Sequence, residues 1–67
     1  MIFKQKILNQ VVNDIAKIQR AKTRMEVEKI MTEAFTKMKL LDSAILVLHL
    51  TAEINFAVNE KRRQINE

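Results

Sequence analysis

The residues that could do chemistry are few, and His49 with Glu53 is the first pair to consider. They lie one helical turn apart, so a helix would place the imidazole and the carboxylate on one face. The di-metal sites of helical bundles instead use Glu-x-x-His, and the residue three before His49 is Leu46. We therefore predict no metal site within one chain. Only a dimer that brought two copies of His49 and Glu53 together would leave metal binding open.

Covalent catalysis and phosphate binding also lack their usual residues. The chain has no cysteine and no glycine, which excludes a thiolate nucleophile and a glycine-rich phosphate loop. Ser43, the single serine, lies where a helix N-cap is expected. Thr23 and Glu26 are spaced as a capping box, so we assign this glutamate to a helix start. The sequence thus predicts no enzyme and no cofactor.

Length and composition favour a small helical fold. The chain has 67 residues, 48% of them apolar, and lacks the glycine and proline that shape the tight turns of sheet proteins. We therefore expect one all-α domain over residues 1–67. A chain this short rarely buries enough apolar area unless a disulfide, a metal or a partner contributes. With no cysteine and a single histidine, we expect self-association or a partner protein.

Apolar residues at intervals of three and four predict helices over about 2–20, 24–40 and 43–63. Asp14 and Lys37 are assigned to the solvent sides of their helices, Lys37 beside Glu33. The second boundary is ambiguous, because the apolar series runs on across Asp42 and Ser43. A break there gives a small three-helix bundle, and a continuous helix gives a helical hairpin with one long second helix. We favour the break because matched helices pack compactly.

The start of the third helix predicts a dimer. Residues 44–48 are apolar on every side, and such a segment is normally covered by more than one neighbour. We expect a homodimer whose interface consists of these apolar residues: Leu40, Leu41, Ile45, Leu46, Val47, Leu50 and Ile54.

Positive charge gathers near three helix ends. The formal net charge is +4, and an up-down-up bundle would bring seven of the twelve cations to one end of the molecule. Such an end could bind phosphates or an acidic protein surface. We call this set the basic pole: Lys17, Arg20, Lys22, Arg24, Lys61, Arg62 and Arg63.

These observations favour a binding protein over an enzyme. We expect a non-enzymatic protein–protein interaction module, a homodimer that acts as a regulator, inhibitor or adaptor of a second protein. The alternative is a nucleic-acid-binding protein that contacts phosphates through the basic pole. The sequence shows no unbroken apolar run for a membrane span or a secretory signal. We therefore expect no membrane partner and a cytoplasmic location.

Overall fold

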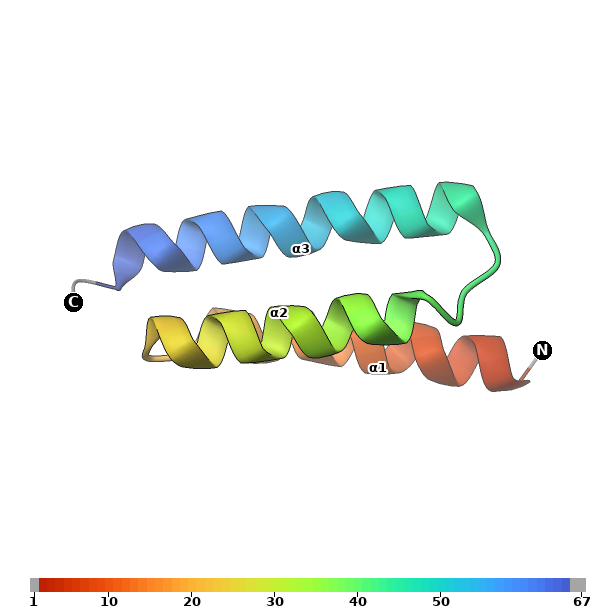
Figure 1. The fold of residues 1–67 in the computed structure, drawn as a ribbon, viewed down its shortest axis with the longest axis horizontal. Helices are drawn as coiled ribbons and strands as arrows, with labels where there is room; N and C mark the ends of the chain where they lie inside the picture. The colour runs from red at the N-terminus through yellow and green to blue at the C-terminus, as the bar shows by residue number, and fades with distance from the viewer. Residues whose placement is uncertain (1, 66–67) are drawn as a thin grey trace.

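Apolar stripes and local caps divide the chain into three helices. The computed structural model describes residues 2–65, with side chains from residue 5 onward. It contains α1 (Ile2–Arg20), α2 (Arg24–Met38) and α3 (Ala44–Gln64), and no strand forms within this range. The helices run up, down and up, so that α1 and α3 point the same way (Figure 1). The all-α, three-helix prediction is confirmed, in a body of 41 × 17 × 14 Å.

The capping box forms at the start of α2. The hydroxyl of Thr23 accepts a hydrogen bond from the amide of Glu26 at 3.2 Å. In return, the Glu26 carboxylate accepts from the amides of Lys22, at 3.0 Å, and Thr23, at 3.2 Å. The bond from the Lys22 amide is the largest cause that lowers the pKa of Glu26 below its ordinary value. The short connection turns the chain back, so α2 runs antiparallel to α1.

The chain breaks between α2 and α3, so the long-helix alternative is wrong. Ser43 has extended backbone angles (φ −103°, ψ 111°), and its hydroxyl accepts from the amide of Leu46 at 3.3 Å. The second helix ends at Met38, two residues before its expected end, because residues 39–41 tighten into turns closed by i to i−3 bonds. Leu41 is 8% exposed and anchors this connection to the core.

The core lies between the three inward stripes. Five of its side chains are fully buried, namely Val11, Ile18, Val27, Ala34 and Ile54. Asp14 is also buried, at 1% exposure, and accepts a hydrogen bond from Lys37 Nζ at 2.8 Å. The assignment of both residues to solvent faces was wrong, because Asp14 lies between Val11 and Ile18 on the seam that α2 covers. This ion pair joins α1 to α2.

Candidate interaction surface

The third helix carries a second apolar stripe that faces solvent. Its core side consists of Leu50, Ile54, Ala57 and Val58. On the opposite side, Ile45, Leu48 and Phe56 are 83%, 73% and 67% exposed, and Ala52 is exposed between them. The spacing of three, four and four residues places these side chains on one face. We call Ile45, Leu48, Ala52 and Phe56 the outer face of α3.

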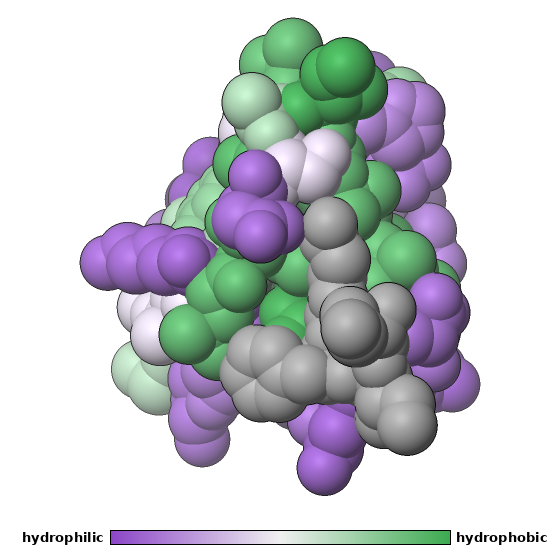
Figure 2. Space-filling view, turned by 90° about the vertical axis from the view of Figure 1, so that its right-hand side faces the viewer, coloured by the Kyte–Doolittle hydropathy of each residue, from purple (hydrophilic) through white to green (hydrophobic). Residues whose placement is uncertain are grey.

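Apolar surface also gathers at one end of the molecule. Figure 2 shows hydrophobic side chains at the top of this end, over the start of α3, continuing toward the connection from α2. Leu40 in that connection is 57% exposed. Large apolar surface of this kind typically marks an interaction site in a small protein.

A groove runs between α1 and α3 along one flank of the outer face. Its volume is about 430 Å³, and its lining combines apolar and polar side chains: Ile15, Gln19, His49, Ala52, Glu53, Phe56 and Ala57. His49 Nε2 lies 3.9 Å from Glu53 Oε1, and both side chains are largely exposed. In the described part of the chain, no three His, Cys, Asp or Glu residues lie close enough together to hold a metal ion. The groove therefore offers one His–Glu pair within an open furrow that is largely apolar.

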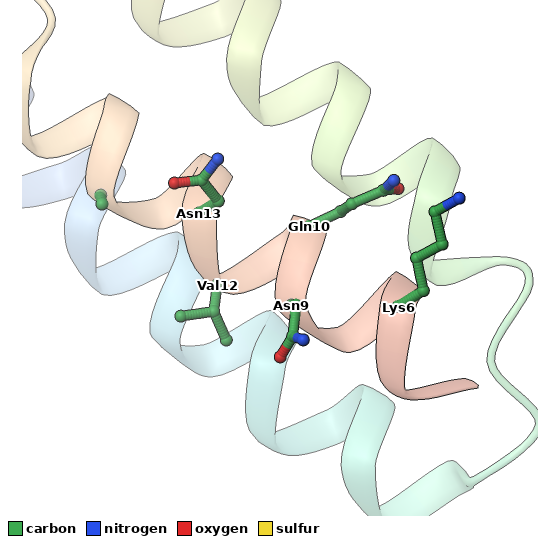
Figure 3. A pocket seen from close by; sticks show the side chains of 6 residues that line it. Lys6, Asn9, Gln10, Val12 and Asn13 are labelled. Atoms are coloured by element: carbon green, nitrogen blue, oxygen red, sulfur yellow. The ribbon is translucent and has the colours of Figure 1, made fainter. Parts of the chain in front are cut away.

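A second hollow lies on α1 alone. It is lined by Lys6, Asn9, Gln10, Val12, Asn13 and Ala16, which all come from this one helix. Figure 3 shows the labelled side chains spreading around the helix instead of converging on one point. Val12 is 51% exposed there and adds apolar surface on α1. The hollow has no convergent polar groups that would hold a small ligand.

The residues expected at a dimer interface divide between the core and the surface. Leu41, Leu50 and Ile54 are at most 8% exposed and are covered by the chain's own helices. Leu46 and Val47 are half-buried against the core, whereas Leu40 and Ile45 are exposed. Of the residues predicted at the dimer interface, Leu40 and Ile45 are therefore the exposed ones. The exposed surface adds Leu48, Ala52 and Phe56, which sequence reasoning missed although their helical spacing was the available signal.

The structure brings the basic pole together at the other end. The end of α1, the start of α2 and the end of α3 lie at one end of the molecule (Figure 1). Two carboxylates face cations there: Arg62 contacts Glu28 across the α2–α3 interface at 3.2 Å, and Arg63 contacts Glu60 at 3.2 Å. The pole is thus a cationic surface with interleaved acids.

No protein-family model, no curated protein and no solved structure matches this chain. Within residues 2–65, the helices are too short or too polar to cross a bilayer. The outer face of α3 and the basic pole are the two candidate interaction surfaces.

Proposed function

We propose that this chain is a non-enzymatic helical interaction module that works in the cytoplasm as a homodimer and regulates, inhibits or links a second protein. The outer face of α3 is the observation that supports this proposal. Its three large apolar side chains are each about two-thirds exposed or more. Exposing them to water is unfavourable by roughly 25 cal/mol for each Å². A binding partner would remove that cost.

The shape of the surface favours a helix as the binding partner. The furrow between α1 and α3 is open along its length, and Ile15, Ala52 and Phe56 provide its apolar lining. Amphipathic helices bind such furrows through residues spaced by three and four. A second copy of this chain can supply a helix of that kind, because its own α3 carries the matching stripe.

Charge substitution on the outer face tests self-association. We expect the wild-type chain to sediment as a dimer at micromolar concentration and Phe56→Glu to sediment as a monomer with unchanged helical circular dichroism. Met25→Glu is the matched control, since Met25 is 82% exposed at the start of α2 and lies off this face. A wild-type chain that stays monomeric throughout the micromolar range would refute the homodimer.

The role toward a second protein needs a separate measurement. Affinity purification of the tagged chain should recover one protein in stoichiometric amount, and the Met25→Glu chain should recover the same one. If the homodimer is the active form, Phe56→Glu should lose that protein while it remains folded. Recovery of the same protein by monomeric Phe56→Glu would contradict a role for the dimer.

The basic pole supports a second candidate function, binding of nucleic acid through phosphate contacts. Arg20 and Arg24 lie on either side of the α1–α2 connection, where the cations of three helix ends meet. Binding to random duplex should weaken steeply with salt, with a slope of about one for each phosphate contact. Arg20→Gln/Arg24→Gln should reduce that slope, whereas Lys39→Gln, after the opposite end of α2, should not. Absence of binding at low salt would remove this function.

A further inference from the structure

We infer that the second copy docks α3 against α3 in antiparallel orientation, with a two-fold axis near Ala52 and with His49 of each chain beside the partner's Glu53. This inference rests on the proposed homodimer and specifies its geometry. It assigns a role to the exposed His49–Glu53 pair, which no other contact of the fold explains. Its support comes from shape, from charge and from exposed area.

The order of side-chain sizes along the outer face suits an antiparallel pair. Leu48 and Phe56 lie four residues before and after Ala52, about 6 Å along the helix in each direction. A two-fold axis at Ala52 therefore sets Leu48 of one chain beside the partner's Phe56, twice. The small Ala52 side chains meet at the centre, where they allow the helices to approach closely. Large and small side chains thus fill one seam in register.

The His49–Glu53 pair also distinguishes the two orientations. His49 and Glu53 both line the groove with Ile15 and Gln19, so both lie on the flank of α3 that faces α1. In a two-fold antiparallel pair, identical flanks meet. Each His49 then lies about 3 Å along the helix axis from the partner's Glu53, and the two Glu53 residues are offset by the same distance. In a parallel pair, this flank would meet the opposite flank, where Asn55 is exposed. Only the antiparallel pair brings His49 close to the partner's Glu53.

The basic pole disfavours the parallel alternative. A parallel dimer would place two sets of seven cations side by side at one end. An antiparallel axis at Ala52 puts Arg62 of each chain at opposite ends, about 30 Å apart along the helix. That separation exceeds the Debye length of about 8 Å at physiological salt, so repulsion between the poles is largely screened.

The exposed area of the chain is large enough for a dimer. The structure exposes 4956 Å², whereas a compact monomer of this mass exposes roughly 4,400 Å². The excess of roughly 550 Å² approaches the area of about 800 Å² that each partner contributes to a standard interface. The elongated shape and the outer face of α3 account for an excess of this kind.

Cysteine cross-linking distinguishes the two orientations, because the chain has no cysteine of its own. Ile45 and Asn59 lie seven residues before and after Ala52, so an antiparallel dimer sets one beside the other across the seam. Under oxidation, a mixture of Ile45→Cys and Asn59→Cys chains should form a mixed disulfide dimer. Neither variant alone should cross-link, since identical positions would lie about 21 Å apart. That separation is well beyond the about 7 Å that a disulfide spans between Cα atoms.

Two further variants complete the experiment. Ala52→Cys should cross-link to itself at the axis, and Glu33→Cys, on the exposed side of α2, should remain uncross-linked. Sedimentation under reducing conditions confirms that each variant still dimerises. Self-cross-linking of Ile45→Cys and Asn59→Cys would show a parallel pair and overturn the inference.

The remaining outcomes separate this inference from the proposed function. A chain that dimerises without any of the expected cross-links pairs through another surface, which refutes the antiparallel seam and leaves the homodimer intact. A monomeric wild-type chain refutes both, and the outer face of α3 would then be available to a helix of a different protein.

Discussion

Asp14 and Lys37 form an ion pair at the boundary between core and surface. The carboxylate is 2% exposed, whereas Lys37 keeps 30% of its side chain in contact with solvent. A buried carboxylate is strongly destabilising without a partner, but an intact ion pair contributes little beyond an apolar pair of similar shape. The lysine is long enough to reach Asp14 with its ammonium group while part of its chain remains at the surface.

Replacing one residue of the ion pair should therefore lower the free energy of unfolding more than replacing both residues. We expect Lys37→Met to lower the free energy of unfolding by about 2 kcal/mol, less than for a fully buried pair because Lys37 is partly hydrated. The double variant Asp14→Leu/Lys37→Met should recover most of that loss. Urea unfolding followed by circular dichroism measures both values. Equal destabilisation by the single and double variants would contradict this account.

Glu26 makes part of the stability depend on pH. Its pKa lies below the ordinary 4.5, first because the Lys22 amide donates to the carboxylate. A carboxylate with a depressed pKa contributes stability that is present above pH 4.5 and lost as the pH falls through the folded-state pKa. We expect the midpoint of thermal unfolding to fall over this acid range, and to fall less in Glu26→Gln. Glu33→Gln, on the same helix, should retain the wild-type dependence, and a Glu26→Gln profile identical to wild type would refute the assignment.

At the scale of elements, local signals set the helix boundaries. Thr23 and Ser43 are both N-caps. The capping box identifies the first from the sequence, whereas the second boundary is ambiguous there because the apolar series runs on across it. The Ser43 cap interrupts an apolar series that would otherwise run on, so it stabilises the bundle against one long helix.

Loss of that cap should weaken the bundle selectively. We expect Ser43→Ala to lower the free energy of unfolding by about 1 kcal/mol, because the Leu46 amide loses its acceptor. Thr32→Ala is the matched control, since the Thr32 hydroxyl bonds a carbonyl within α2, where alanine is the better helix former. Chemical denaturation compares the two. A Ser43→Ala chain as stable as wild type would show that packing alone sets the break.

The inward face of α3 could not be predicted, for a physical reason. Two faces of α3 are apolar, one that includes Ile54 and one that includes Ala52. The apolar periodicity therefore predicts a helix but does not show which of the two faces is buried. The choice depends on how α1 and α2 pack, which is a non-local property. The position of Asp14 is missed for the same reason, since only the arrival of Lys37 from α2 makes a carboxylate tolerable on that seam.

At the scale of the whole molecule, two kinds of surface lie toward opposite ends. Figure 2 shows apolar side chains at the start of α3. The helix ends that carry the basic pole lie at the opposite end (Figure 1), with Lys61, Arg62 and Arg63 in the last turn of α3. In the inferred antiparallel dimer, the apolar faces are buried at the centre and a basic pole remains at each end. The dimer would thus present two cationic surfaces that a partner of opposite charge could bind together, with higher affinity than one surface provides.

Charge exchange across the seam provides an independent test of this arrangement. His49→Glu places only acids on the α1-facing flank, and His49→Lys/Glu53→Lys places only cations there, so each chain alone should dimerise about tenfold more weakly than wild type. An equimolar mixture pairs acids with cations at both sites, and native mass spectrometry should detect the heterodimer as the main dimeric species. Glu33→Lys, which reverses a charge on α2, should leave self-association unchanged. Like charges brought together across the seam should weaken the dimer. If both altered chains self-associate as tightly as wild type, His49 and Glu53 therefore do not meet across the two-fold axis.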